Sequence, residues 1–300
     1  MNKMKIRILL LNLFAALMLF SSCSDSDIVK KKDDNGIMKF LVQHPSVATR
    51  ATSSNFELDD KIGVFVVKEI DEASAPLQVS GNHTNNELVT FNGATWESRK
   101  PIFWPTELVD IYAYYPYMEI ISVDAQPFSV KLDQSSPERV DILSGYEASD
   151  FLWTMKSGLE YSEKPVPLQF KHTMSKLVIK LVKGADYEGE LPENAEIFIH
   201  NTVPSALIDL ATGVVLKDPY GKPSTIKCRK VSNDQFEAII VPQRIETRRP
   251  LIEIVANDIA YLLEDNFNFR VGMQHTLNLV INSSPEQIKI EIDPSTGDWD

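Results

Sequence analysis

A series of short segments in which apolar and polar residues alternate is the feature that most constrains how this chain folds. In the first of them, Met38, Phe40 and Val42 alternate with Lys39 and Gln43. A period of two places every second side chain on the same face of a β-strand. Further strands are expected at residues 61–67, 109–115, 176–182, 196–200, 236–241, 251–255, 259–263, 276–281 and 288–292. Because no amphipathic helix of ordinary length is found, the sequence predicts an all-β fold of antiparallel β-sandwiches.

Turn residues between these segments predict β-hairpins. The sharpest signal is Asn92-Gly93 between apolar arms, because a two-residue type I′ turn requires positive φ at both positions. Two further hairpins are expected to turn at residues 211–213 and at Asn257-Asp258.

The length of the chain and a pair of prolines predict two tandem domains. With 300 residues, the chain is long enough to bury one or two cores without a disulfide. Pro165 and Pro167 interrupt the strand pattern near its middle. We therefore expect an N-terminal β-sandwich over residues 37–164 and a C-terminal β-sandwich over residues 165–300. Within the first domain, residues 37–43 are expected to form the first strand and residues 44–54 a loop.

The N-terminal residues are typical of an export signal. Three basic residues precede a charge-free apolar run over residues 8–20, which is shorter than the ~20 residues needed to span a bilayer. The following Leu19-Phe-Ser-Ser-Cys23 resembles a bacterial lipobox, although Phe20 departs from the usual leucine. We expect residues 1–22 to be a lipoprotein signal peptide, Cys23 to carry lipid and residues 23–36 to form a flexible tether. The alternatives are a plain secretory signal with an incidental cysteine, a buried helix or a short membrane anchor.

Charge and cysteine content exclude several classes of function. The net charge of −12 argues against nucleic acid as a partner, because nucleic-acid binding favours a basic surface. If Cys23 is lipidated, Cys228 is the only other cysteine, and it is expected to be an ordinary strand residue. No motif of a hydrolase, metalloprotease or nucleotide-binding loop occurs, and the five histidines are scattered. We therefore expect no enzymatic activity, no cofactor and no metal, with His172 in a structural role.

Aromatic residues gather in one part of the N-terminal half. They are Phe103, Trp104, Tyr112, Tyr114, Tyr115 and Tyr117. Exposed aromatic rings stack on sugars, so this cluster is a candidate glycan-binding surface. Alternation places Tyr112 and Tyr114 on one face of a strand and Tyr115 on the other. In the alternative interpretation, one face builds the core of a sandwich and the other lies against a loop.

An ordered set of short motifs resembles the fimbrillin-like (Mfa-like) family of lipoprotein pilins and adhesins of Bacteroidales-type bacteria. The resemblance spans most of the chain after Cys23. Its motifs are Phe40 with Thr49-Arg50-Ala51, Asp60-Lys-Ile-Gly-Val-Phe65, Trp96 before Pro101-Ile-Phe-Trp-Pro105, Ile111-Tyr-Ala-Tyr-Tyr-Pro116, Asp150-Phe-Leu-Trp153 and Leu168-Gln-Phe-Lys-His172-Thr-Met-Ser-Lys-Leu177. One departure is His275 in Gly272-Met-Gln-His275, where relatives often have tyrosine. The resemblance implies two tandem transthyretin-like antiparallel β-sandwich domains behind a lipoprotein signal.

The resemblance also implies a mechanism of assembly. In polymerising relatives, a protease cuts after an arginine in the loop that follows the first strand, and a strand of the next subunit fills the groove left behind. The matching cleavage in this chain lies between Arg50 and Ala51. It would release the strand that carries Met38, Phe40 and Val42. The alternative for Arg50 is a solvated linker residue.

The C-terminal segment is a candidate donor strand. Ile288, Ile290 and Ile292 alternate with Lys289 and Glu291, as a strand that fills pockets on one face requires. The alternative is an ordinary last strand of the second domain.

Together these observations lead us to expect a fimbrial subunit or adhesin, exported as a lipoprotein and assembled by protease-triggered donor-strand exchange. The expected partners are other pilin subunits in a homo- or heteropolymer, the outer membrane through lipid on Cys23, and host or bacterial surface ligands. The protein would then reside on the outer membrane, or in the fimbrium after processing. The resemblance does not distinguish stalk, tip and anchor subunits. The alternative function is an outer-membrane surface lipoprotein that binds glycan for an uptake system.

Overall fold

Nearly all regular structure in the described part of the chain is β-strand, which confirms the expected all-β fold. The computed structural model describes residues 36–45, 55–70, 73–257, 259–282, 289–292 and 297–299. Within these ranges, the one helical element is a 3₁₀ turn, η1 (Glu147–Ser149). A search of the same ranges found no helix with the length and apolar character needed to cross a membrane.

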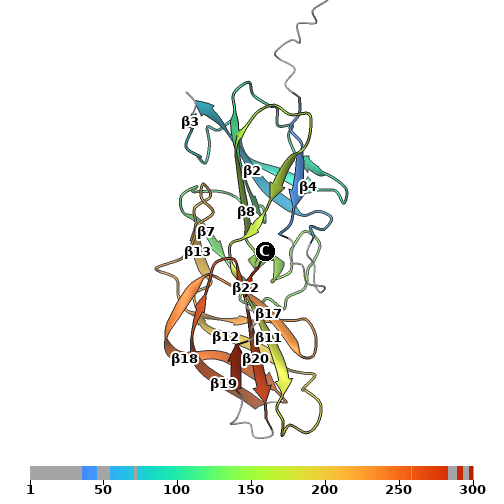
Figure 1. The fold of residues 1–300 in the computed structure, drawn as a ribbon, viewed down its shortest axis with the longest axis vertical. Coiled ribbons are helices and arrows are strands. Elements are labelled where there is room, and N and C mark those ends of the chain that lie inside the picture. Colours follow the sequence, from blue (N-terminus) through green and yellow to red (C-terminus); the bar gives the residue numbers. More distant parts are fainter. Residues whose placement is uncertain are drawn as a thin grey trace, which may run out of the picture. The chain divides into compact units, whose positions relative to one another are not determined.

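The largest sheet has seven strands and is antiparallel throughout. Its main order is β10 (Lys171–His172), β8 (Leu152–Leu159), β6 (Val109–Tyr115), β2 (Lys61–Ile70), β4 (Thr84–Phe91) and β5 (Trp96–Ser98), with β3 (Ala73–Ser74) paired to β2. Figure 1 shows β2 and β8 among these strands, with β4 beside them. We call this the central sheet.

The central sheet is buried on both faces, and this follows from the apolar pattern of its middle strands. All seven residues of β6 are buried. Ile111, Ala113 and Tyr115 face one hydrophobic core, whereas Tyr112 and Tyr114 belong to another. The predicted division of this strand into two faces is therefore confirmed, and each face packs into a core.

A two-stranded sheet covers one face of the central sheet and closes what we call the N-terminal core. Strand β1 (Phe40–Gln43) runs parallel to β9 (Val166–Gln169), with Phe40 opposite Val166 and Val42 opposite Leu168. Both strands contribute buried side chains to the core that also holds Ile62 and Trp104.

Three further sheets surround a second, larger core. One contains β16 (Arg229–Lys230), β17 (Gln235–Ile240), β11 (Ser175–Lys183), β20 (Met273–Ile281) and β21 (Lys289–Ile292), with β22 (Gly297–Asp298) also paired to β20. Another contains β15 (Ser224–Lys227), β12 (Glu196–Thr202), β18 (Gln243–Ala256) and β19 (Ile259–Phe269). The third contains β14 (Val215–Lys217), β13 (Ser205–Ile208) and β7 (Gln126–Ser129). Strands β11 and β20 lie side by side and are parallel (Figure 1).

Strand pairing crosses the domain boundary expected between residues 164 and 165. Strands β9 and β10 follow this point but pair with β1 and β8. Strand β7 precedes it but pairs with β13. The larger core is continuous from Tyr112 and Tyr114 of the central sheet to Leu177 of β11 and Ile252 of β18. The division into two tandem transthyretin-like domains stays a prediction.

The Asn92-Gly93 hairpin forms, but its turn differs from the predicted one. Phe91 pairs with Trp96, and the backbone N–H of Asn92 donates to the carbonyl of Thr95 at 3.0 Å. Gly93 has positive φ (+89°), whereas Asn92 does not appear among the residues with positive φ. The Asn92 side chain instead accepts hydrogen bonds from the backbone N–H groups of Ala94 and Thr95. The Asn92 side chain therefore caps the turn formed by the residues that follow it. The expected type I′ geometry is wrong.

A close approach between two central strands explains the glycine in the motif over residues 60–65. Gly63 pairs with Tyr114, and a Cβ atom added to Gly63 would lie 2.4 Å from ring carbons of Tyr114. The Tyr114 hydroxyl is held 2.6 Å from Asn86 Oδ1 and 2.8 Å from the carbonyl of Met118. The ring covers the glycine and has little freedom to move away, so only a residue without a side chain fits at position 63.

The last described residue packs into the body of the protein. Trp299 is 3% exposed and belongs to the larger core. Its indole stacks on the His172 ring with centroids 3.7 Å apart and an interplanar angle of 5°. The backbone N–H of Trp299 donates to the carbonyl of Gly272 at 2.8 Å. Trp299 is thus held by His172 of β10 and by the backbone of Gly272.

Replacing Gly63 with alanine should destabilise the protein by about 1–3 kcal/mol, because the added methyl group overpacks against the fixed Tyr114 ring. Urea denaturation of Gly63→Ala and the parent measures this loss. In a Tyr114→Leu background the same substitution should cost much less, since leucine lacks the ring atoms that clash. Equal costs in both backgrounds would contradict the proposed contact.

Replacing Trp299 with alanine should lower the free energy of unfolding by about 3 kcal/mol, the usual cost of removing a buried indole. Tyr220→Ala is the matched control, because the Tyr220 side chain is 92% exposed. Its cost should stay within about 0.5 kcal/mol. Thermal or urea denaturation distinguishes the two variants, and equal stability of Trp299→Ala and the parent would show that the C-terminal contact contributes nothing.

Candidate functional site

The first strand lies in a groove with backbone partners on both sides. On one side, the N–H groups of Val166 and Phe170 donate to the carbonyls of Lys39 and Gln43 at 2.8 and 3.1 Å. On the other side, the N–H of Met38 donates to the carbonyl of Ile102 at 2.7 Å. We call this groove, bounded by β9 and by residues 102–104, the first-strand seat.

The side chains of the first strand alternate between the core and the surface, as predicted. Met38 and Phe40 are 2% and 7% exposed and lie in the N-terminal core. Val42 is partly buried and packs against the same core. Ile37 and Leu41 point outward and are half exposed. The strand therefore contributes two fully buried apolar side chains to a core that it also closes.

Several residues singled out from the sequence lie outside the described residues. They are Cys23, Arg50, Ala51 and Ile288. Their expected roles in lipidation, processing and strand donation stay predictions.

The candidate donor segment is placed in the chain's own sheet. Strand β21 pairs antiparallel with β20, with Ile290 opposite Leu279 and Ile292 opposite Leu277. It is the edge strand of that sheet. This position agrees with the alternative interpretation, in which the segment is an ordinary strand of its own domain. To leave the sheet, an edge strand has to break its backbone hydrogen bonds with only one neighbouring strand.

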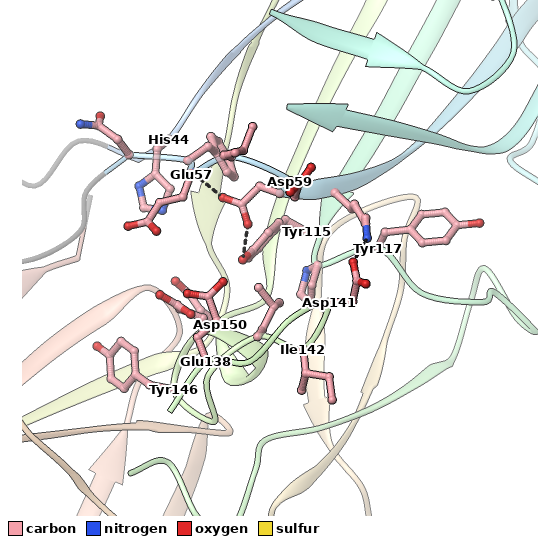
Figure 2. A pocket seen from close by; sticks show the side chains of 18 of the residues that line it. His44, Glu57, Asp59, Tyr115, Tyr117, Glu138, Asp141, Ile142, Tyr146 and Asp150 are labelled. Carbon is pink, nitrogen blue, oxygen red and sulfur yellow. Dashed lines mark hydrogen bonds and ion pairs between the residues drawn. The ribbon is translucent and has the colours of Figure 1, made fainter. Parts of the chain in front are cut away.

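A cavity of about 780 Å³ opens where the first strand ends. His44, directly after β1, and residues 55–61, directly before and at the start of β2, line one part of it. Residues 138–143, 146, 147 and 150 line another part. Figure 2 shows His44 and Glu57 on one side of this space, Glu138, Asp150 and Tyr146 on the other, and Tyr115 between them. We call it the acidic cavity, because carboxylates dominate its wall.

The carboxylate of Asp60 is the most strongly held acidic group of the cavity wall. It accepts hydrogen bonds from the backbone N–H of Glu57 at 2.7 Å and from the Tyr115 hydroxyl at 3.0 Å (Figure 2). Burial raises the pKa of Asp60, and the nearby Glu147 and Glu57 carboxylates raise this pKa further. Burial also raises the pKa of Tyr115, with a contribution from the Asp60 charge. Negative charge is therefore crowded around Tyr115.

His172 has the structural role expected for it. The ring is 5% exposed, and its Nδ1 lies 3.0 Å from Asp150 Oδ1. Trp299 stacks on one face, and the His44 ring makes an edge contact at 5.6 Å between centroids. Burial lowers the pKa of His44. Sequence reasoning missed Trp299, because a single tryptophan near a chain end has no spacing that relates it to His172.

The aromatic cluster is mostly buried and forms no open platform. Trp104, Tyr112, Tyr114 and Tyr115 are each at most 7% exposed and pack in the two cores. Phe103 is 54% exposed. The burial of these four rings agrees with the alternative in which they build the core, with the difference that both faces of β6 pack into cores.

Within the described ranges, no group of His, Cys, Asp and Glu side chains has the arrangement of a metal site. Cys228 lies between β15 and β16 and not within a strand as expected; it is buried, and burial raises the pKa of its thiol. A buried neutral thiol is unreactive. The chemistry of this region is therefore suited to binding. The first-strand seat binds an extended strand, and the acidic cavity provides carboxylates that can accept hydrogen bonds from a ligand.

Comparison with known proteins agrees with this architecture. A solved candidate cell adhesion protein from Bacteroides ovatus is 18% identical with a TM-score of 0.67, covering 88% of this chain and 98% of that chain. A candidate cell adhesion protein from Bacteroides uniformis is 18% identical with a TM-score of 0.63, covering 82% and 93%. A fimbrial protein from Bacteroides vulgatus is 15% identical with a TM-score of 0.51, covering 80% and 93%. At such identities, the likeness shows a shared fold.

No curated protein matches the chain. The model of the fimbrillin-like family, in contrast, matches residues 49–299, which is most of the sequence and includes nearly all motifs that suggested this family. The chain therefore belongs to the fimbrillin-like family.

Proposed function

We propose that this protein is a fimbrial or adhesive subunit that is exported as a lipoprotein and polymerises by exchange of its first strand. The family is one of adhesive and structural proteins, so the protein is not an enzyme. The observation that carries the proposal of strand exchange is the first-strand seat. The short segment there supplies two buried core residues, Met38 and Phe40, and pairs with one neighbouring strand, β9.

Removal of the first strand would leave a groove that requires a replacement. Loss of Phe40 and Met38 would expose apolar core, at a cost of about 1.5–3 kcal/mol for each side chain. The N–H groups of Val166 and Phe170 and the carbonyl of Ile102 would lose their partners. An extended strand from another subunit restores both kinds of contact, because backbone bonds supply affinity and alternate side chains fill the core.

Release of the strand requires a cut in the chain between β1 and β2. In our proposal the cut falls between Arg50 and Ala51, so that Met38, Phe40 and Val42 leave with the N-terminal part of the chain. The lipid expected on Cys23 leaves with them. The lipid then serves export and anchoring of the precursor, while the processed subunit resides in the fimbrium.

The partners in this proposal are other pilin subunits, the outer membrane through Cys23, and ligands on host or bacterial surfaces. The donor strand of the next subunit is the segment with Ile288, Ile290 and Ile292. Its support is the edge position of β21, which has one paired neighbour in the sheet. The alternative of a glycan-binding lipoprotein receives no support from the aromatic cluster of residues 103–117, because most of its rings lie in the cores.

Cleavage after Arg50 should be required for polymerisation. N-terminal sequencing of the processed surface protein should begin at Ala51, and the processed protein should form SDS-resistant ladders. Arg50→Gln should keep the N-terminal part of the chain and lose the ladders. Arg244→Gln, which replaces an exposed arginine of β18 away from the cavity, should polymerise as the parent does. Ladders formed by Arg50→Gln, or a nicked protein that stays monomeric and retains residues 38–42, would contradict strand exchange.

The emptied seat should rebind a peptide with the sequence of residues 36–45. Replacing Phe40 with serine in this peptide should weaken binding about tenfold or more, because a buried ring is worth ~1.5–3 kcal/mol. Replacing Leu41 with serine is the matched control, since Leu41 is 52% exposed and points away from the core. Fluorescence anisotropy of the labelled peptides on protein cut after Arg50 measures both affinities. Equal weakening by the two substitutions would show that the peptide does not occupy the seat.

A further inference from the structure

The described wall of the acidic cavity carries more carboxylates than cationic groups. Its acidic residues are Glu57, Asp59, Asp60, Glu138, Asp141, Glu147 and Asp150. Its basic residues are Lys61, Arg139, Lys176 and Arg229. A ligand of this cavity must therefore first complement its excess of negative charge.

Most of the basic groups in the wall are already paired. Arg229 Nη2 lies 2.7 Å from Glu237 Oε2, and Lys176 Nζ lies 3.5 Å from Glu237 Oε1. Glu237 is 2% exposed and does not line the cavity. Lys61 pairs with Asp141 at 3.6 Å. Apart from Asp141, the carboxylates of the cavity wall are not paired with these three cations.

Several aromatic rings of the wall contact neighbouring side chains. The Trp299 ring stacks on His172. The Arg229 guanidinium lies 3.6 Å from the centroid of the Tyr146 ring. Tyr115 makes an edge contact with Phe56. The Trp299 and Tyr146 rings each have one face in contact with another side chain.

His172 contributes a buried imidazole ring to this wall. Its Nδ1 lies 3.0 Å from a carboxylate oxygen of Asp150. Nε2 is buried and has no hydrogen-bond partner among the described residues. Nε2 is thus a polar atom that the neighbouring side chains leave unsatisfied.

We propose that the acidic cavity binds the guanidinium or ammonium group of a basic side chain from a peptide segment. A basic side chain supplies several N–H donors and a positive charge, which the carboxylates of Asp60, Glu147 and Asp150 accept. The volume of about 780 Å³ admits a side chain together with adjoining backbone. This proposal goes beyond strand exchange and holds whether or not the first strand is exchanged.

Two sources supply the same chemistry. One is Arg50 of this chain, which lies between Pro45 and Asn55 in the sequence, and the chain borders the cavity at His44 and again at Asn55. The other is an arginine or lysine of a second subunit or of another protein. In the first case the cavity would hold the processing site, and in the second it would contribute to assembly or adhesion.

Titration calorimetry on the full chain tests the proposal with N-acetyl-arginine amide and its neutral isostere N-acetyl-citrulline amide. The arginine probe should bind about tenfold more tightly, since hydrogen bonds to ionised groups are about twice as strong as neutral ones. Glu147→Gln should weaken its binding about three- to tenfold. Glutamine keeps the acceptor for the backbone N–H of Ser144, which Glu147 Oε2 meets at 3.3 Å. Glu138→Gln, at an exposed position, is a second test should Glu147→Gln disturb the fold.

The matched control is Glu264→Gln, which removes one negative charge from β19 away from the cavity and should leave the affinity unchanged. Arg50→Gln identifies the source. Tighter binding of the arginine probe to Arg50→Gln than to the parent supports Arg50 as the natural occupant, and equal binding supports a side chain from another molecule. If the arginine and citrulline probes bind equally, or neither binds the parent or Arg50→Gln, the proposal is overturned.

Discussion

Strand β6 has no side that faces solvent, and the arrangement of the other sheets depends on this burial. Ile111, Ala113 and Tyr115 require a cover on one face of the central sheet, and Tyr112 and Tyr114 require a cover on the other. The first cover is the small sheet of β1 and β9, and the second is built by β7, β13 and the strands beyond them. A central sheet that is apolar on both faces is stable only as the middle layer of a larger assembly.

The two covers differ in how firmly the chain holds them. The larger core is lined by strands from several sheets and is closed at one point by Trp299. The N-terminal core is closed by β1, a strand of four residues that pairs in parallel with β9. In the proposed exchange, this short strand is the part that an extended segment of another subunit replaces. This asymmetry is the physical basis of the proposed strand exchange, and the acidic cavity lies where the replaceable strand ends.

The motifs that indicated the family are mainly packing devices. Gly63 leaves room for the ring of Tyr114, and Trp153 Nε1 donates to the carbonyl of Leu210 at 2.8 Å. His172 is held between Asp150, His44 and Trp299. These three motif residues thus each contact residues that are distant in the chain.

Alternation of apolar and polar residues was sufficient to predict the all-β fold, the two faces of β6 and the inward side chains of the first strand. These properties are local, because a period of two decides which side chains share a face before any partner strand is chosen. The geometry of the turn at Asn92 was predicted wrongly. The Asn92 side chain accepts hydrogen bonds from the backbone of the turn, and residue preferences do not reveal this contact.

Pairing partners and the site were decided by the tertiary structure. Nothing local in residues 166–169 indicates that they pair with β1, and nothing near Trp299 indicates that it stacks on His172. The acidic cavity likewise contains carboxylates from separate segments of the chain. The sequence sets how many carboxylates there are, and the packing of the sheets brings them together. By itself the sequence determined which strand faces must be buried. The tertiary structure decided which segments cover those faces. Any apolar segment can bury an apolar face, whereas the geometry of the packed sheets selects one particular segment.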